Sequence, residues 1–366
     1  MSFIKKFRKS ISKDKRIFKI DKVHGVNVIE KFIDPIINLY DGKGIKIFSL
    51  GREQDRLLEK FNIDYSRPEE YFNQVKKDNG WDYELIDRKE TYDLIIFWGS
   101  NFIEPRFIHQ LRNKLCASVL TIGDSYLVDY FTPGEVIRFM YNSDIYCDTI
   151  DGIPGFSQEL IYLTNRIRTG EIQNFKETNN RTYEFTDEEI EIEELMDYDV
   201  TVVPNSSVVE LNKYIRELIF KRNDTLPDVG DRMITYEPIQ TKDIDGNRLD
   251  LRFGEEVKVL DTRMETNGIF VCKFKTNKGV EFEHWVDTNW LGKKYNDLDM
   301  DHVDGGRKFF YSYVVPPEVI VDNTYNSMAC IVENNQVNEK RVLYSVLTSV
   351  RKELKVYYNG EKDYLF

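Results

Sequence analysis

This chain of 366 residues lacks several features that would place it in common protein classes. No apolar run approaches the roughly 20 residues needed to cross a bilayer, and the first twenty residues lack the apolar centre of a secretory signal. The four cysteines (Cys116, Cys147, Cys272 and Cys330) form no CxxC pair, and none of the four histidines is paired at ligand spacing. We therefore expect reduced thiols, a cytoplasmic location and no metal site.

Negative charge exceeds positive charge over the whole chain, but positive charge is concentrated at the start. The net charge of −12 discourages general binding to nucleic acid. Residues 1–19 nevertheless hold eight Lys or Arg and one Asp, a local charge of +7 that leaves −19 for the remainder. We interpret residues 1–20 as a basic tail that binds nucleic acid or an acidic partner, or that is simply a solvated terminus. Its candidate contact residues are Lys5, Lys6, Arg8, Lys9, Lys13, Lys15 and Arg16.

Buried strands alternate with helices along most of the chain. Strands are expected at 45–50, 92–97, 118–124 and 354–358, and helices at 52–63, 104–115, 157–172 and 338–353. Such alternation is typical of a parallel α/β sheet. Residues 230–290 change to short alternating strands separated by Gly, Asn and Asp turns, which predicts a small antiparallel β-barrel or sandwich.

Five segments together resemble the RecD/Dda-like branch of the superfamily-one DNA helicases. They are DLIIFWGSN (93–101), LTIGDSYLVDY (120–130), NRIRTGEI (165–172), LNKYIRELIF (211–220) and NEKRVLYSVLTSVRKELKVYY (338–358). The segment LRFGEEVKVLDTRM (251–264) is similar to the start of that family's inserted barrel.

The resemblance implies an α/β fold with two RecA-like parallel-sheet domains and an inserted small antiparallel SH3-like β-barrel. The first domain would span 21–180, the second 181–229 and 296–366, and the inserted barrel 230–295. Because RecA-like architecture serves many functions, the fold by itself does not identify an activity.

Four positions depart from the family pattern in ways that affect ATP chemistry. Trp98 and Gly99 stand where the resemblance implies an acid pair, Leu127 stands in place of a glutamine, and Ser349 stands in place of an arginine finger. No G-K-S or G-K-T phosphate-binding sequence occurs in the chain. From these degenerate positions we expect no catalytic residues, no enzymatic activity and no cofactor. We expect Trp98 to pack in the core, with stacking on a nucleobase as the alternative.

The resulting hypothesis is a catalytically inactive helicase-like protein. It would act as a scaffold or nucleic-acid-associated subunit of a replication, transcription or virion assembly, with a bacteriophage as the expected source and host cytoplasm or virion as its location. The alternatives are an ATP-independent single-stranded DNA-binding protein and an ATP-dependent DNA helicase with non-standard motifs. The expected partners are proteins, with DNA as a further candidate, and neither a membrane nor a small-molecule substrate.

One acidic loop invites a metal-site hypothesis. The segment DLDMDHVDGG (297–306) superficially resembles a calcium-binding loop. It lacks the bidentate glutamate at the twelfth position of an EF-hand loop. We therefore interpret it as a solvated loop.

Overall fold

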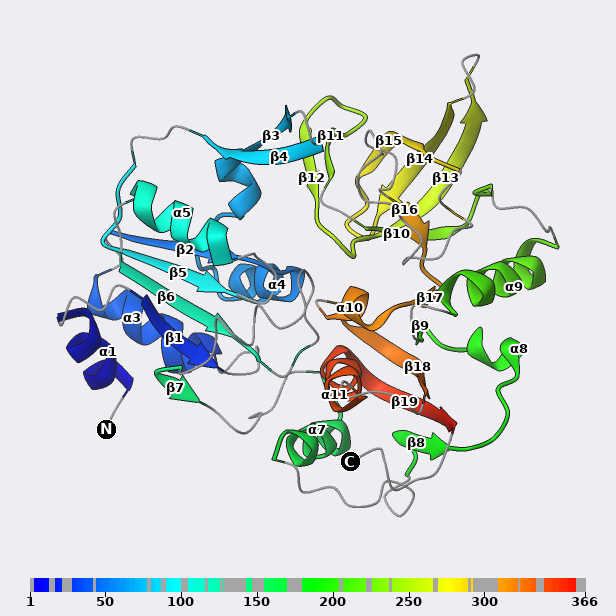
Figure 1. Cartoon of the computed structure of the whole chain (residues 1–366), viewed down its shortest axis with the longest axis horizontal. Coiled ribbons are helices and arrows are strands. Elements are labelled where there is room, and N and C mark those ends of the chain that lie inside the picture. The colour runs from blue at the N-terminus through cyan, green and yellow to red at the C-terminus, as the bar shows by residue number, and fades with distance from the viewer. Residues whose placement is uncertain are drawn as a thin grey trace. The chain divides into compact units, whose positions relative to one another are not determined.

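The computed structural model divides the chain into two compact units (Figure 1). Unit 1 comprises Met1–Lys76, Trp81–Gln173 and Lys340–Thr348, and unit 2 comprises Lys77–Gly80, Asn174–Glu339 and Ser349–Phe366. The structure describes residues 3–12, 17–21, 28–41, 44–77, 80–86, 90–99, 105–115, 118–125, 127, 143–146, 155–169, 180–203, 207–221, 226–236, 239–265, 269–288, 291, 309–321, 323–333 and 339–359.

Unit 1 is built on a five-stranded parallel sheet. Its strands are β1 (Ile17–Asp21), β2 (Ile45–Ser49), β5 (Leu94–Trp98), β6 (Ser118–Gly123) and β7 (Ile145–Tyr146). They lie in the order β2-β5-β6-β1-β7, and every neighbouring pair is parallel. A separate hairpin consists of β3 (Phe72–Lys77) and β4 (Gly80–Leu85), preceded by a 3-10 turn at Pro68–Tyr71.

The helices of unit 1 are short. They are α1 (Phe3–Ser12), a π-helical turn (Ile29–Ile33) that runs into α3 (Asp34–Leu39), α4 (Arg52–Lys60), α5 (Pro105–Leu115), α7 (Gln158–Thr169) and most of α11 (Glu339–Ser349). Pro35 lies directly after the point where the π-helical turn runs into α3, and it cannot donate the i→i−4 hydrogen bond of a regular α-helix there. Among the described residues, no helix is both long and apolar enough to cross a bilayer.

The central strand β5 is apolar on both faces. Side chains alternate along a strand, and accordingly Leu94, Ile96 and Trp98 lie in one core cluster, which includes residues of α1, α3 and α4. Ile95 and Phe97 lie in a second cluster, together with residues of α5. A parallel sheet covered on both faces needs such a continuous apolar run, which is why the segment YDLIIFW reads as a buried strand.

The first twenty residues contribute a helix and a strand to unit 1 instead of standing outside it as a tail. On α1 the Phe7 ring is buried, and its centroid lies 5.4 Å from that of Phe18 on β1. Phe3 contacts Phe32 in an edge-on arrangement with centroids 5.1 Å apart. The cationic side chains of α1 occupy its opposite, exposed face. The helix is therefore amphipathic, with an aromatic face on the core and a basic face toward solvent.

Unit 2 contains a second five-stranded parallel sheet. Its strands are β8 (Tyr183–Thr186), β9 (Val200–Val202), β17 (Val314–Val315), β18 (Tyr325–Glu333) and β19 (Val350–Asn359), in the order β17-β9-β18-β19-β8. Its helices are α8 (Ile192–Leu195), α9 (Val208–Phe220) and α10 (Pro317–Ile320). These two parallel sheets with their helices fit the α/β, RecA-like helicase fold.

An antiparallel module interrupts unit 2 between α9 and β17. Its strands are β10 (Arg232–Thr235), β11 (Ile239–Lys242), β12 (Arg248–Leu251), β13 (Glu256–Met264), β14 (Phe270–Thr276), β15 (Glu281–Val286) and β16 (Phe309–Tyr311). Five of them form a sheet in the order β15-β14-β13-β10-β16, and β11 pairs with β12. Because β16 pairs with β10, the module extends beyond residue 295.

A buried ion pair joins the module to α9. Arg216 on α9 donates to the carboxylate of Asp231, with Nη2 2.9 Å from Oδ2, and Asp231 is fully buried. Tyr313 also donates to Asp231 across 3.1 Å. The carboxylate is thus fully hydrogen-bonded, as a buried charge must be.

We predict that α1 is an integral part of unit 1. Phe7→Ala should lower the free energy of unfolding by about 3–5 kcal/mol, because it removes a buried ring surrounded by other rings. Lys6→Ala, on the exposed face of the same helix, should change it by less than about 0.5 kcal/mol. Urea unfolding of both variants measures the difference, and equal effects would contradict this placement of α1.

Candidate functional site

The carboxyl edge of the unit 1 sheet has a topological switch point between β1 and β6. The connection leaving β1 leads to β2 on one side of the sheet, whereas the connection leaving β6 leads to β7 on the other side. In open α/β sheets, ligand sites form in the crevice outside the carboxyl ends of two such strands. Asp21 ends β1 and Asp124 directly follows β6, so both carboxylates lie at this position.

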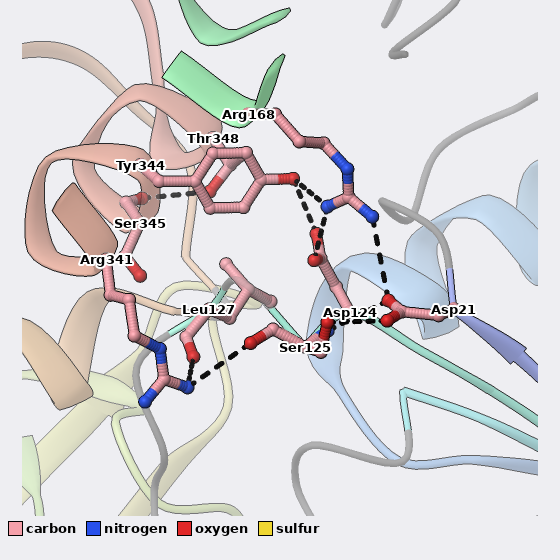
Figure 2. A network of polar contacts seen from close by, with 9 residues as sticks. All are labelled: Asp21, Asp124, Ser125, Leu127, Arg168, Arg341, Tyr344, Ser345 and Thr348. Atoms are coloured by element: carbon pink, nitrogen blue, oxygen red, sulfur yellow. Dashed lines mark hydrogen bonds and ion pairs between the residues drawn. The ribbon is translucent and has the colours of Figure 1, made fainter. Parts of the chain in front are cut away.

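A buried arginine joins these carboxylates (Figure 2). Arg168, from α7, places Nη1 2.6 Å from Oδ1 of Asp124 and Nη2 3.6 Å from Oδ1 of Asp21. Tyr344, from α11, donates its hydroxyl to Oδ2 of Asp124 across 2.6 Å and accepts from Arg168 Nη1 across 2.9 Å. All four residues are at least 96% buried. We call Asp21, Asp124, Arg168 and Tyr344 the switch-point network.

The loop after β6 adds further contacts to the network. Ser125 donates to Asp21 twice, from its backbone N across 3.0 Å and from Oγ across 2.5 Å. Arg341, one turn before Tyr344 on α11, donates to the carbonyls of Ser125 and Leu127 (Figure 2). Helix α11 is therefore attached to this loop at two successive turns.

Burial controls the protonation of the network. It raises the pKa of Asp21 above the ordinary 3.8, with a smaller rise from the charge of Asp124, although hydrogen bonds from Ser125 and the charge of Arg168 act in the opposite direction. Burial alone would lower the pKa of Arg168, but the adjacent Asp124 carboxylate and the other network groups raise it above its usual value. Burial, followed by the charge of Asp124, raises the pKa of Tyr344 well above 10. The guanidinium therefore stays charged and the phenol stays a donor.

The geometry does not suit a divalent cation between the two aspartates. The guanidinium of Arg168 already contacts both carboxylates. Within the described ranges, no group of three or more His, Cys, Asp or Glu side chains gathers where it could hold a metal ion. The network is thus suited to positioning α7 and α11 against the strand ends.

Trp98 and Gly99, the two positions expected to carry an acid pair, lie at the carboxyl end of β5. The Trp98 side chain is fully buried among apolar residues, so its ring has no face open for the alternative role of stacking on a nucleobase. Gly99 adopts φ +90°, a region that favours glycine, and donates to the Ile122 carbonyl across 2.9 Å.

The remaining predicted positions are divided between the two units. Leu127 is buried in unit 1, and its carbonyl accepts from Arg341. Ser349 is buried in unit 2, where its hydroxyl donates to the Ile320 carbonyl across 3.0 Å. Four of the predicted basic residues are exposed on α1, whereas three lie outside the described residues. The exposed ones are Lys5, Lys6, Arg8 and Lys9, and the others are Lys13, Lys15 and Arg16.

Sequence reasoning noted Asp124 but did not select Asp21, Arg168 or Tyr344. A signal for two of them was present, because Arg168 and Tyr344 lie in the segments NRIRTGEI and NEKRVLYSVLTSVRKELKVYY, on which the resemblance partly rests. The fold brings these two residues together with Asp124, which lies in a third such segment. The acidic loop 297–306 lies outside the described residues.

The chain is similar to solved structures of Pif1 helicases. Pif1 from Bacteroides bound to ssDNA is 12% identical, with a TM-score of 0.53 over 100% of this chain and 94% of that one. Bacteroides Pif1 in complex with ADP-AlF3 and ssDNA is 13% identical, with a TM-score of 0.51 over 100% of this chain and 94% of that one. Pif1 from Candida albicans is 11% identical, with a TM-score of 0.50 over 100% of this chain and 95% of that one. No protein-family model and no curated protein matches the chain.

These neighbours show that the chain shares the fold of Pif1 helicases, and they correct one prediction. The expectation that the chain is not an enzyme is contradicted, because its structural neighbours are Pif1 helicases, one of them solved with ADP-AlF3 and ssDNA. That expectation rested on four positions of the sequence and on the absence of a G-K-S or G-K-T sequence. The structural match, in contrast, covers the whole chain.

We predict that Arg168 is essential for the stability of unit 1. Arg168→Met should lower the free energy of unfolding by about 3–5 kcal/mol, since it leaves two buried carboxylates without their cation. Arg166→Met, two residues earlier on the same helix and partly exposed, serves as the control and should cost less than about 1 kcal/mol. Urea denaturation compares the two, and a small loss for Arg168→Met would contradict the network.

A second prediction concerns pH. The pKa of Asp21 is raised in the folded state, so the folded protein binds this proton more tightly than the unfolded chain does. The free energy of unfolding therefore falls as the pH rises from 3.8 through the raised pKa of the folded state. Asp21→Asn removes this titration. The unfolding free energy of the variant relative to the unmodified chain should therefore increase between about pH 4 and pH 7.

The control for this pH series is Asp64→Asn, at an exposed carboxylate. Because Asp21 is buried and Asp64 is exposed, the change of relative stability with pH should be larger for Asp21→Asn than for this control. A relative stability of Asp21→Asn that stays constant or falls with pH would contradict the burial argument.

Proposed function

We propose that this chain is a helicase-like enzyme that binds single-stranded DNA and takes ATP as its substrate at a non-standard nucleotide site. The observation that supports this most strongly is the extent of the likeness to ssDNA-bound Pif1, which spans all of this chain and nearly all of that one. A match of this extent includes both parallel sheets and the antiparallel module. We further propose that this module closes as an SH3-like barrel.

The position of the proposed nucleotide site follows from the topology of unit 1. In the sequence, residues 22–27 lie between the end of β1 and the π-helical turn Ile29–Ile33. Nucleotide-binding sheets place phosphates at such a strand-to-helix connection, where backbone N–H groups at a helix start attract anions. The sequence there, KVHGVN, contains one glycine and no G-K-S or G-K-T, so the proposed site is non-standard.

The switch-point network would act on α11 in this proposal. Arg168 and Asp124 hold Tyr344 at the carboxyl edge of the sheet. Helix α11 continues without a break into β19, the second strand from one edge of the unit 2 sheet. The residues of the network would thus be positioning residues, which link the strand ends of unit 1 to the segment that enters unit 2.

The basic face of α1 is the proposed contribution of the N-terminal segment to DNA binding. Lys5, Lys6 and Arg8 are exposed, and no acidic residue lies on this helix. Contacts from such cations to phosphates are independent of sequence and weaken with salt. Helix α1 would therefore add affinity for DNA without selecting a base sequence.

The direct test measures DNA binding, ATP hydrolysis and unwinding by the full chain. We expect binding of a fluorescein-labelled oligo-dT to fall steeply with salt, ATP hydrolysis to be stimulated by this oligonucleotide, and a forked duplex to be unwound only with ATP. DNA binding without hydrolysis would replace this proposal with the alternative of ATP-independent single-strand binding. Absence of both activities would overturn the proposal.

We predict that the basic face of α1 contributes to the salt dependence of DNA binding. The triple variant Lys5→Gln, Lys6→Gln and Arg8→Gln should reduce the slope of log K against log salt concentration by about 2, at roughly 0.7 for each phosphate contact to a single strand.

The matched control removes three exposed cations elsewhere, by Lys60→Gln, Lys213→Gln and Lys352→Gln. This control should leave the slope nearly unchanged. If both triple variants reduce the slope equally, α1 makes no specific contribution and only the net charge matters.

A further inference from the structure

A groove of about 570 Å³ lies at the carboxyl edge of the unit 2 sheet. The connections leaving the adjacent strands β9 and β18 run in opposite directions across this sheet, so their carboxyl ends form a second switch point. Val203 directly follows β9, and Ile331 lies near the end of β18; both line the groove. In Figure 1, α8 and α9 lie on the side toward which the arrows of β18 and β19 point.

The floor and one wall of the groove are apolar or aromatic. Tyr357 and Tyr358, near the end of β19, are buried in the floor. On the wall, Leu211 and Tyr214 of α9 face the groove, and the Tyr214 side chain is 52% exposed. Leu218 follows four residues later on the same face of the helix and is 41% exposed. An apolar stripe on α9 therefore runs past the groove without being covered by the described residues.

The rim of the groove carries charge of one sign. Asp187, Glu188 and Glu189 follow β8, and Glu210 projects from α9. Among the described residues that line the groove, none is Lys, Arg or His. Such a rim repels phosphates and attracts cations, which excludes the nucleic acid of the proposed function as the occupant.

We infer that this groove binds a lysine- or arginine-rich segment of a protein partner. The carboxylates of Glu188, Glu189 and Glu210 pair with the cationic heads. The aliphatic stems and intervening apolar residues of the segment pack against Tyr214 and Leu218, as amphipathic side chains do on apolar surfaces. An exposed tyrosine ring beside carboxylates also offers a favourable face to a guanidinium or ammonium group.

A peptide is favoured over a small ligand by the continuity of the surface. The groove opens onto the α9 stripe, and a helical segment with apolar residues at i, i+3 and i+7 would match the spacing of Leu211, Tyr214 and Leu218. This inference is independent of ATP or DNA binding.

The test uses the full chain and a fluorescein-labelled, 14-residue amphipathic peptide of lysine and leucine. Fluorescence anisotropy should show binding of this peptide and none of the same peptide with glutamine in place of lysine. The triple variant Glu188→Gln, Glu189→Gln and Glu210→Gln should weaken binding about tenfold, since three rim ion pairs contribute a few-fold each. Tyr214→Ala should weaken it several-fold, whereas Tyr214→Phe should retain the affinity.

The matched control removes the same charge from exposed positions that are not among the described lining residues, by Asp64→Asn, Asp245→Asn and Glu265→Gln. It should change the affinity less than twofold. If the control weakens binding as much as the groove variant, or if Tyr214→Ala binds as the unmodified chain does, the peptide responds only to the net charge of the protein and the inference is overturned.

Discussion

The structure of unit 1 depends on one buried arginine. Arg168 neutralises the carboxylates of Asp21 and Asp124, which lie at the carboxyl ends of β1 and β6. Tyr344 donates a further hydrogen bond to Asp124. Without the cation, Asp21 and Asp124 would be like charges buried side by side, an arrangement that costs several kcal/mol. Because its members come from four segments of the chain, the network also fixes α7 and α11 against the strand ends.

The two units differ in what occupies the switch point of their parallel sheets. In unit 1 the switch point is filled by a compensated ion network, next to the connection where the proposed nucleotide would bind. In unit 2 the switch point opens as an acidic groove with an aromatic floor. The groove is negatively charged and would bind the proposed basic peptide, whereas the exposed face of α1 is positively charged and would bind the proposed DNA. The chain therefore has a basic surface although its net charge is −12.

Elements that show a clear apolar pattern within their own sequence were predicted correctly. Features that depend on contacts with residues far along the chain were missed. The strand at 118–124 corresponds to β6 (Ser118–Gly123), and the helix at 157–172 contains α7 (Gln158–Thr169). By contrast, β1 was read as part of a basic tail, because the apolar residues of IFKI stand among lysines and pair with strands more than 100 residues away. The network was missed for the same reason: Arg168 lies 44 residues from Asp124 and 176 from Tyr344.

A double-mutant cycle on Asp124 and Tyr344 tests the central claim most directly. Asp124→Asn, Tyr344→Phe and the double variant would be compared with the unmodified chain by urea unfolding. If the network acts as a unit, the effects on the unfolding free energy will depart from additivity by about 0.5–3 kcal/mol. Additive effects, within about 0.3 kcal/mol, would contradict the claim that these residues hold α11 to the strand ends through one shared interaction.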